Sequence, residues 1–388
     1  MTDAAPPPEP TNADLPVAPT NADLPAAPAN SDLPVAPTNS DLPVAPTNSF
    51  ASDNASGVAP HVMAALAEAN TGSALAYGDD DWTRRAESTV DDLLGRHVET
   101  LLCWGGTGAN VVGLASVLQP HQSIITVDSA HIVVDECGAP VRFSGSSLHT
   151  APNVDGKLSP DAIDEFAQWL GSEHHPQPAV VSVSQATEMG TCYSLDELAA
   201  ICDRAHAHSM LVHLDGARIA NALAAADTSL ATMVAETGVD VMTLGMTKNG
   251  AMYGEAVVFL DPDLARHARF VRKQAGQLPS KTRFVAAQLL ALLDDDLWLR
   301  NAAHANEMAT LLARSTEGLA GVELVREPQV NSVFVRLPRE HIDALQAWSF
   351  FWDWDLSDRL MRWMTSWATT AEDVERFRDG VAHLLADG

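Results

Sequence analysis

Lys248 has the surroundings that a reactive amine requires. It is one of four lysines in the chain and lies in "TLGMTKNGAMYG", an apolar, glycine-spaced stretch with no other charge for several residues on either side. Desolvation in such a pocket lowers the pKa of a lysine and frees its amine as a nucleophile. Because an imine with a carbonyl cofactor also removes the buried charge, we predict a covalently held carbonyl cofactor at Lys248. The alternative is an exposed loop lysine.

A carboxylate and an arginine follow a second apolar run, in the segment "HLDGAR". Asp215 would end a buried strand, and Gly216 would allow the turn into the next helix. A carboxylate in that position must pair with a cation or accept hydrogen bonds. Two interpretations remain open from this motif alone. Asp215 and Arg218 form a local ion pair, or Asp215 holds a pyridinium nitrogen protonated while Arg218 faces the ligand.

A glycine-rich turn precedes both motifs, in the segment "WGGTGAN". Gly106 and Thr107 lie where a predicted strand meets a helix, and free N–H groups at a helix N-terminus suit a phosphate. The segment has neither the lysine of a Walker loop nor the spacing of a dinucleotide-binding turn, so it indicates little alone. In chain order, however, a phosphate cradle, a carboxylate and a lysine at successive strand ends indicate pyridoxal 5′-phosphate (PLP).

Apolar runs that alternate with helical segments from about Phe50 onward would position these motifs. This alternation predicts βα units and a mostly parallel sheet, with helices on both faces because the strands are apolar throughout. In such sheets, ligands bind outside the carboxyl ends of the strands, where the three motifs fall. The predicted strands are 98–104, 123–127, 179–184, 210–215, 240–245 and 255–260, and the predicted helices are 107–118, 194–208 and 218–226.

The chain divides by composition into a tail and two domains. Residues 10–48 contain a nine-residue repeat with regular prolines, which predicts a disordered, acidic tail over residues 1–49 with a polyproline II bias. An array of short motifs that binds a partner is the alternative. We predict a large domain over residues 50–297. A long helix, an apolar strand at 331–337 and a Trp-rich stretch predict a smaller α/β domain over residues 298–388.

Charge and composition exclude several classes of partner. The chain has 51 acidic and 23 basic residues, a formal charge of -28, and 46% hydrophobic residues. This hydrophobic content indicates a globular protein, and its negative charge repels nucleic acid and anionic membranes. We therefore expect neither as a partner. The four cysteines lack metal-binding spacing, so we predict reduced thiols in a cytoplasmic protein and no metal site. The N-terminus shows no secretory signal pattern.

From about Phe50 to its C-terminus, the chain resembles the low-specificity L-threonine aldolases of the aromatic amino acid β-eliminating lyase group. The resemblance implies the aspartate aminotransferase fold (PLP fold type I), PLP as cofactor, and active sites between the subunits of a homo-oligomer, either a dimer or a homotetramer. The segments that carry it are "FASDN", "YGDD", "GGTGAN", "DSAHIVVDE", "QATEMGTCYS", "HLDGAR", "TLGMTKNG", "RKQAGQLPSKTRF" and "RWMTSWATT".

The resemblance also implies which residues hold the cofactor. Lys248 would bond to PLP, Asp215 would pair with the pyridine nitrogen, and Gly106 and Thr107 would bind the phosphate. His131 would stack on the pyridine ring and is one candidate for the catalytic base. The alternative for His131 is a histidine that caps a helix after a strand.

The remaining implied roles concern the substrate and the rim of the site. Arg218 and Arg362 would hold the substrate carboxylate, beside the hydroxyl of Ser52, and Arg218 would also contact the cofactor. Arg283 would approach the phosphate from a neighbouring subunit. His174 would be a second active-site histidine and the other candidate for the base.

The implied reaction is the PLP-dependent retro-aldol cleavage of L-threonine, L-allo-threonine and related β-hydroxy-α-amino acids, phenylserine among them, to glycine and an aldehyde. One alternative is a PLP-dependent β-eliminating lyase or amino-acid racemase on the same fold. Another is a catalytically inactive relative that acts through its repeats. The aromatic segment 345–358 either lines the substrate side and favours bulky substituents or packs the small domain.

Overall fold

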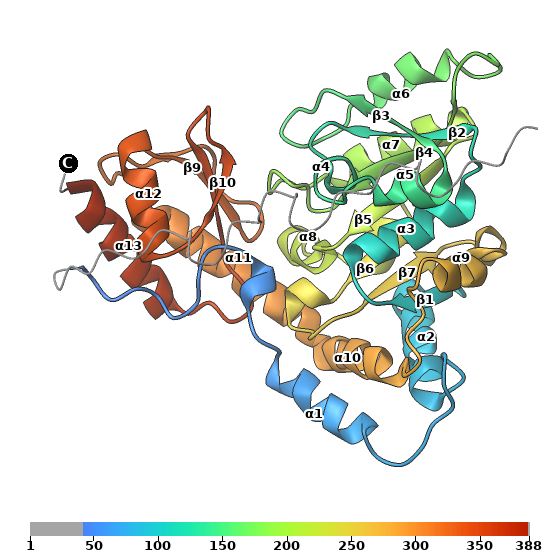
Figure 1. Cartoon of the computed structure of the whole chain (residues 1–388), viewed down its shortest axis with the longest axis horizontal. Helices are drawn as coiled ribbons and strands as arrows, with labels where there is room; N and C mark the ends of the chain where they lie inside the picture. The colour runs from blue at the N-terminus through green and yellow to red at the C-terminus, as the bar shows by residue number, and fades with distance from the viewer. Residues whose placement is uncertain (1–41, 387–388) are drawn as a thin grey trace, which may run out of the picture.

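Two bodies, each built on a sheet, are joined by the long helix α11 (Leu297–Thr316) in the computed structural model, which describes residues 42–386 (Figure 1). The predicted tail up to residue 41 lies outside the described residues. Between residues 42 and 386, no helix combines the length and the apolar character needed to cross a membrane.

A seven-stranded sheet forms the centre of the large domain, in the order β1-β7-β6-β5-β4-β2-β3. All neighbouring strands are parallel except β7, which runs antiparallel to both β1 and β6. The predicted mostly parallel sheet and all six predicted strands are therefore confirmed. The strands are β1 (Glu99–Cys103), β2 (Gln122–Val127), β3 (Ser147–Ala151), β4 (Gln177–Ser184), β5 (Leu211–Gly216), β6 (Val241–Gly245) and β7 (Glu255–Phe259).

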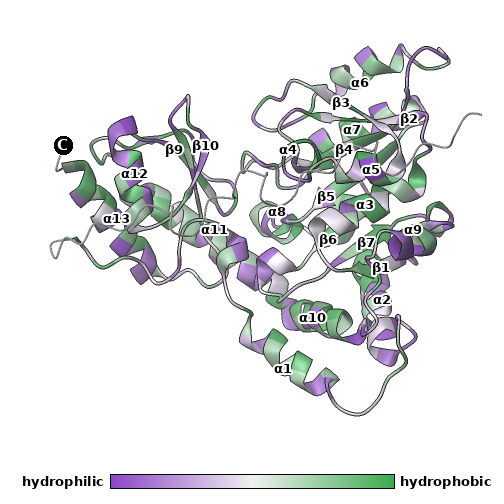
Figure 2. Cartoon of the chain, in the orientation of Figure 1, coloured by the Kyte–Doolittle hydropathy of each residue, from purple (hydrophilic) through white to green (hydrophobic). Residues whose placement is uncertain are grey.

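Helices cover both faces of this sheet, and the three predicted helices correspond to α3, α7 and α8. The capping box of Ser194 and Glu197 fixes the start of α7. Helix α10 is hydrophobic over most of its length because it packs against α1, α2 and α11 (Figure 2). The helices are α1 (Pro60–Ala69), α2 (Asp81–Leu94), α3 (Gly106–Val117), α4 (His131–Val134), α5 (Ala139–Ser144), α6 (Pro160–Ala167), α7 (Leu195–Ala207), α8 (Ile219–Ala226), α9 (Ala268–Gln274) and α10 (Arg283–Leu293).

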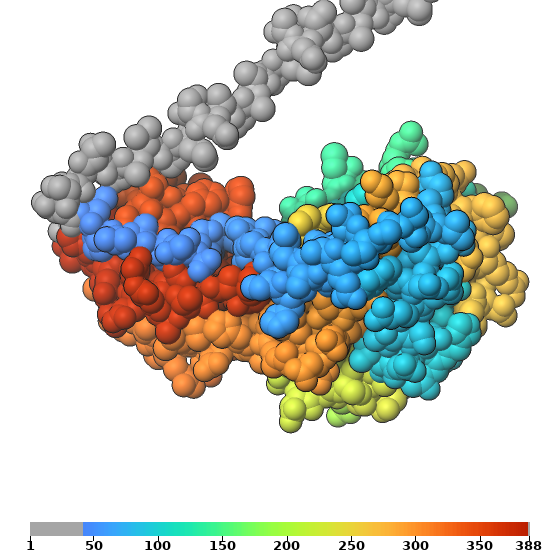
Figure 3. Space-filling model, turned by 90° about the horizontal axis from the view of Figure 1, so that it is seen from below, coloured from blue at the N-terminus to red at the C-terminus, as the bar shows by residue number. Residues whose placement is uncertain are grey.

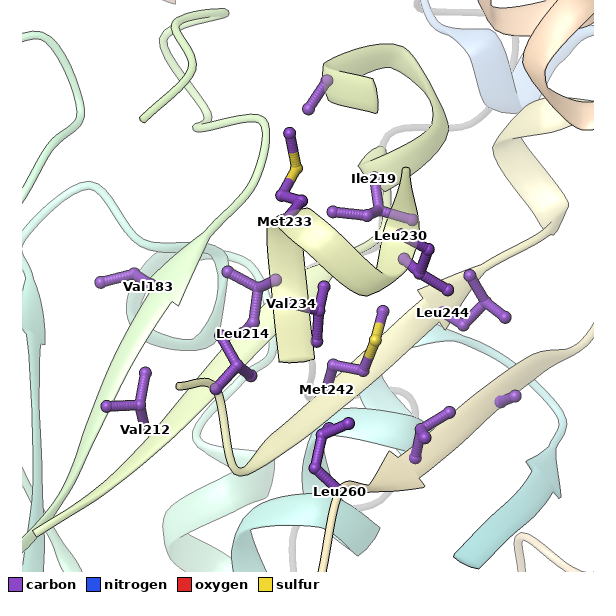
Figure 4. Packing of buried hydrophobic residues seen from close by; sticks show 14 of the residues in the cluster. Val183, Val212, Leu214, Ile219, Leu230, Met233, Val234, Met242, Leu244 and Leu260 are labelled. Atoms are coloured by element: carbon purple, nitrogen blue, oxygen red, sulfur yellow. The ribbon is translucent and has the colours of Figure 1, made fainter. Parts of the chain in front are cut away.

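Strand β7 illustrates why apolar residues follow one another in the strands. Successive side chains of a strand point to opposite faces. Val257 packs in a cluster with residues of α3, whereas Val258 belongs to the larger cluster on the other face. In that larger cluster, Met233 and Val234, from the helical turn Ala231–Ala235, lie close to the side chains of β5 and β6 (Figure 4). Both faces are buried, as predicted.

The small domain has a four-stranded antiparallel sheet, in the order β10-β11-β9-β8. Its core is aromatic, with the rings of Trp363 and Phe377 5.1 Å apart. The predicted apolar strand at 331–337 corresponds to β9. The elements are β8 (Glu323–Leu324), β9 (Ser332–Arg336), α12 (Arg339–Trp348), β10 (Trp352–Asp355), β11 (Leu360–Met364) and α13 (Ala371–Ala386).

Residues 42–49 lie along the small domain rather than outside it (Figure 3). Phe50, predicted to open the large domain, is fully buried in the small-domain core. The predicted boundary of the tail at residue 49 is therefore too late in the chain. The sequence did not indicate that residues 42–49 bind the small domain, because this proline-rich segment has no core of its own and is held by side chains more than 300 residues away.

Candidate active site

A pocket of about 380 Å³, its open mouth included, lies at the carboxyl ends of β4, β5 and β6. It brings together five of the predicted residues, namely Gly106, His131, Asp215, Arg218 and Lys248. A larger groove between α1, α2 and α10 contains none of the predicted residues. The lining of the pocket is completed by Asn110, Glu136, Ser184, Ala186, Glu188 and Ala217.

Lys248 lies in the helical turn Thr247–Asn249 that follows β6. Among the described residues, no acceptor and no carboxylate lies within bonding distance of its amine. Burial lowers the pKa of Lys248, and the positive charge of Arg218 adds to this effect, although Asp53 and Asp215 oppose it. The end of β6, just before this turn, approaches the residue that follows β5 because Gly245 has no side chain: a Cβ there would lie 2.3 Å from the carbonyl oxygen of Ala217. Because its pKa is lowered and it has no partner among the described residues, the amine of Lys248 is free to act as a nucleophile.

Asp215 ends β5 and is held by hydrogen bonds to both carboxylate oxygens. Its Oδ2 accepts from Asn110 Nδ2 at 2.7 Å, and its Oδ1 accepts from the N–H of Ala217 at 2.9 Å. Burial raises the pKa of Asp215, but the charge of Lys248 and these two bonds outweigh it and leave the pKa below its usual value. A buried carboxylate that stays ionised suits a cationic partner such as a pyridinium nitrogen.

Arg218 pairs with Asp53, not with Asp215. Its Nε donates to Asp53 Oδ2 at 2.7 Å and its Nη2 to Asp53 Oδ1 at 2.9 Å, and Asn331 also donates to Asp53 at 3.1 Å. Burial raises the pKa of Asp53, but Arg218 outweighs it and brings the pKa to about 2. The local Asp215–Arg218 ion pair that the motif left open is therefore wrong. Sequence reasoning missed Asp53, although it adjoins the predicted Ser52.

Arg362, on β11, brings a second guanidinium toward Arg218. It lies over the ring of Trp354, 4.8 Å from the ring centroid, and no described carboxylate pairs with it. Burial and the charge of Arg218 lower the pKa of Arg362 to about 10, and no residue that the structure describes forms a hydrogen bond with its buried Nε. Two guanidinium groups and a donor without a partner are suited to bind an anion such as a carboxylate.

The aromatic segment before Arg362 mainly packs the small domain. Phe351 is fully buried in the core, and Trp352 is half exposed on β10. Trp354 contacts Arg362 on one side and Phe334 on another, with ring centroids 5.5 Å apart. The packing interpretation therefore accounts for the segment better than a substrate-lining role.

His131 begins α4 and is held by a carboxylate that the sequence reasoning missed. Its Nδ1 lies 2.8 Å from Glu136 Oε1, and the same oxygen accepts from Asn110 Nδ2 at 2.9 Å. Asn110 thereby links Glu136 to Asp215. The hydrogen bond from Glu136 raises the pKa of His131, although burial and Lys248 oppose it. The position of Glu136, five residues after His131 in the same segment, was the available signal.

Glu188 is a third ionisable group that sequence reasoning missed. Its Oε1 accepts from Ser184 Oγ at 2.6 Å and from the N–H of His131 at 2.9 Å, whereas its buried Oε2 has no partner among the described residues. Burial raises the pKa of Glu188 despite these bonds. A carboxylate with a raised pKa is a stronger base than an ordinary one.

The N-terminus of α3 forms one wall of the pocket. The helix begins at Gly106 after an extended Gly105, and no side chain caps it, so its first N–H groups are free. No described atom lies within 4 Å of the position of a Cβ on Gly106, so there is open space beside the start of the helix. Thr107, the next residue of the helix, does not line the pocket. Free N–H groups beside open space suit a phosphate.

Ser52 and Arg283 do not line this pocket. Ser52 precedes Asp53, and its hydroxyl accepts from the N–H of Asn54. Arg283 begins α10 and donates to the carbonyl of Gly72 at 3.4 Å, outside the pocket of its own chain.

His174 lies at the wrong end of its strand. It is exposed in the loop before β4, whereas the pocket lies at the other end of β4, beyond Ser184. A strand of eight residues spans about 25 Å, so a residue at its start cannot reach a site at its end. The prediction that His174 shares this pocket is therefore wrong, and Glu188 stands where a second ionisable group was expected.

Known proteins resemble this chain in sequence over most of its length, and in fold. A family model described as beta-eliminating lyase matches residues 49–340. The low specificity L-threonine aldolase of Pseudomonas aeruginosa is 44% identical over 333 residues, which cover 85% of this chain and 95% of that protein. The corresponding enzyme of a Pseudomonas species is 41% identical over 340 residues, covering 87% and 97%.

A solved structure extends the similarity to three dimensions. The threonine aldolase of Leishmania major superimposes with a TM-score of 0.80 at 31% identity, covering 87% of this chain and 99% of that one. The fold that the resemblance implied, PLP fold type I, is confirmed. The chain belongs to the beta-eliminating lyase family, whose members are PLP-dependent.

Proposed function

We infer that the chain is a PLP-dependent aldehyde lyase that cleaves L-threonine, L-allo-threonine and related β-hydroxy-α-amino acids to glycine and an aldehyde. The names of its relatives support this activity. The observation that carries it is the presence, in one pocket, of an unpartnered amine at Lys248, a carboxylate at Asp215 and the open N-terminus of α3.

The residues of the pocket fit PLP. Lys248 would hold the aldehyde carbon, Asp215 the pyridine nitrogen, and the N–H groups of Gly106 and Thr107 the phosphate. His131 would lie against the ring. When bound, PLP accepts the electron pair that remains on Cα after the Cα–Cβ bond breaks.

Arg218 and Arg362 would bind the substrate carboxylate. Asp53 already occupies the Nε–Nη2 edge of Arg218, so the Nη1 side remains for the substrate. Arg362 has no carboxylate of its own among the described residues, and a substrate carboxylate would balance its charge. The hydroxyl of Ser52, next to Asp53, would be a third contact.

Glu188 is our candidate for the group that removes the proton from the β-hydroxyl oxygen. The Cα–Cβ bond can break only as that proton leaves, so a base is needed within reach of the β-hydroxyl group. The pKa of Glu188 is raised and its Oε2 has no partner, whereas the raised pKa of His131 keeps that imidazole protonated over a wider range and makes it a poorer base.

A homo-oligomer with active sites between subunits accounts for Arg283. Arg283 lies outside the pocket of its own chain, and its buried Nε has no partner between residues 42 and 386. We propose that it reaches the phosphate of a neighbouring subunit, in a dimer or tetramer. The cytoplasm is the proposed compartment because all four cysteines are unpaired.

The test compares the purified protein with its Lys248→Ala variant. We expect the unsubstituted protein to show the visible absorption of PLP bound to a lysine and to release an aldehyde and glycine from L-threonine and L-phenylserine. The variant should lose both, because only an amine at this position can hold the aldehyde carbon. Release of ammonia and a keto acid would instead support a β-eliminating lyase. A change of configuration at Cα without cleavage would support a racemase. Visible absorption that persists in Lys248→Ala would refute the assignment of Lys248 as the residue that holds PLP.

A further inference from the structure

Residues 42–49 bind a defined surface of the small domain. The indole Nε1 of Trp348 donates to the carbonyl of Pro43 at 2.8 Å, and Leu42 and Ala45 pack against the small-domain core. We call this segment the docked unit. We call Trp348, Ala368 and Asp373, with the core beside them, the docking surface.

Asp373 provides most of the polar contacts to the docked unit. Its Oδ1 accepts from the N–H groups of Thr47 and Asn48 at 2.8 and 3.1 Å, and its Oδ2 accepts from Asn48 Nδ2 at 2.8 Å. Asn48 Nδ2 also donates to the carbonyl of Ala368 at 3.0 Å. Asp373 is 3% exposed, and its reciprocal hydrogen bonds with Thr370 at the start of α13 fix its orientation. The orientation of Asp373 is thus set by contacts within the small domain.

The docked unit is one copy of the nine-residue repeat. Its sequence, "LPVAPTNS", is identical to residues 33–40, and residues 15–22 and 24–31 differ from it at only one and two positions. The three positions that differ correspond to Val44, Thr47 and Ser49, which are the exposed residues of the docked unit. The five residues common to all four copies are those partly buried on the docking surface, namely Leu42, Pro43, Ala45, Pro46 and Asn48.

We propose that the docking surface is a binding site for the repeat unit Leu-Pro-x-Ala-Pro-x-Asn, and that residues 33–40 of the same chain are its second occupant. Every residue that contacts the docking surface has an identical counterpart in residues 33–40. When residues 33–40 bind, residues 41–49 form a loop, while Phe50 remains buried in the small-domain core.

The loop determines which unit binds. Closing a loop of nine residues disfavours residues 33–40 by roughly 30-fold relative to the docked unit, which continues directly into Phe50. A hydrogen bond to a charged group contributes roughly 10- to 100-fold to an equilibrium. Removing the side chain of Asn48 loses one such bond, to Asp373, and a second bond to Ala368. Loss of Asn48 together with Leu42 is therefore sufficient to reverse the preference.

Hydrogen exchange measured by mass spectrometry on the full chain tests this exchange of units. In the variant Leu42→Ala/Asn48→Ala, we expect residues 42–49 to lose protection and peptides covering residues 33–40 to exchange about tenfold more slowly than in the unsubstituted chain. Adding Asn39→Ala should remove this gain. Exchange of residues 33–40 that stays unchanged while residues 42–49 lose protection would overturn the proposal.

Two further variants and a dilution series keep the result interpretable. Val44→Ala changes an exposed position to the residue found in the copy at 24–31, so protection should stay unchanged. Asp373→Asn weakens the docking surface for every copy, so neither unit should be protected if the small domain remains folded. Protection of residues 33–40 that falls on dilution would identify an occupant from a second molecule and overturn the assignment to the same chain.

Discussion

Glu188 accepts a hydrogen bond from the backbone N–H of His131, and the pKa of both side chains is raised. The raised pKa has opposite effects on their ability to act as a base. A raised pKa turns a carboxylate into a better base, whereas a raised pKa keeps an imidazole protonated. The two pKa values are raised for different reasons. The carboxylate of Glu188 is buried, with one oxygen unpartnered among the described residues, whereas the imidazole of His131 contacts the carboxylate of Glu136. Residue type alone would have assigned the base to a histidine.

Replacing Glu188 by glutamine tests its role as the base. We expect Glu188→Gln to lower kcat by about 100-fold or more, the usual contribution of a general base. Because the pKa of Glu188 is raised, activity should fall as the pH drops through that value, and the variant should lack this acidic limb of the pH–rate profile. An unchanged acidic limb would assign the base to another group.

Ser184→Ala is the matched control for this experiment. The hydroxyl of Ser184 lowers the pKa of Glu188 by donating to its ionised form. Its removal should therefore move the acidic limb to higher pH while most of the activity at alkaline pH remains.

Lys248, Asp215 and Gly106 could be predicted from the sequence because each residue follows an apolar run in a local pattern that constrains its chemistry. Asp53 and Glu188 could not, because a carboxylate in a loop is usually exposed and nothing local marks its partner. Arg218 lies 165 residues from Asp53 in sequence, so only the tertiary structure pairs them.

At the scale of elements, the Asp53–Arg218 pair joins segments of both domains. Asp53 belongs to the helical turn Asp53–Ala55, Arg218 precedes α8, and Asn331 precedes β9 of the small domain. The sulfur of Met364, at the end of β11, lies 3.6 Å from Arg218 Nη2. The pair therefore contributes to the docking of the domains as well as to the site.

Replacing Asp53 by asparagine should destabilise the protein in a pH-dependent way. The pKa of Asp53 is about 2 when folded and 3.8 ordinarily, so the pair contributes about 2 kcal/mol at neutral pH, which is lost as the pH falls from about 4 to 2. Urea unfolding should show Asp53→Asn less stable at pH 7, with the difference reduced to about half at pH 3. Asn54→Ala, at the exposed neighbour, should show no such pH dependence; an equal loss at both pH values would contradict the linkage.

Burial made the strands of the large sheet predictable, but not every buried element. The six predicted strands of that sheet are mostly apolar, whereas β3, β8 and β10 were missed because they carry polar or exposed residues and lie at the edges of their sheets. Strand β11 was also missed, although it is mostly buried and lies inside its sheet. The antiparallel direction of β7 was not predicted, because a strand buried on both faces has the same apolar pattern in either direction.

At the scale of the whole molecule, the pocket of one chain lacks the predicted contact from Arg283. A homo-oligomer would supply it from a neighbour, and mixed oligomers can test this. Alone, Lys248→Ala should be inactive and Arg283→Ala should be weakly active. Co-expressed, they should regain about a quarter of the active sites in a dimer, because a hybrid restores one intact site of two.

Assay of the co-expressed mixture for aldehyde release measures this recovery. Arg283→Lys is the control, since it keeps the charge and should lose less activity than Arg283→Ala. Activity that is no higher in the mixture than in the separate variants would place Arg283 in the site of its own chain or outside any site.

The position of Arg362 has a consequence for selectivity. Lys248 and Asp215 stand on the large domain, whereas Arg362 stands on a small-domain strand, fixed over Trp354. In the proposed roles, the large domain recognises the amine end of the substrate, and its Arg218 shares the carboxylate with Arg362 of the small domain. Bound substrate would then link the large domain to the small domain. An amine without a carboxylate would not bind productively, because it cannot contact both domains.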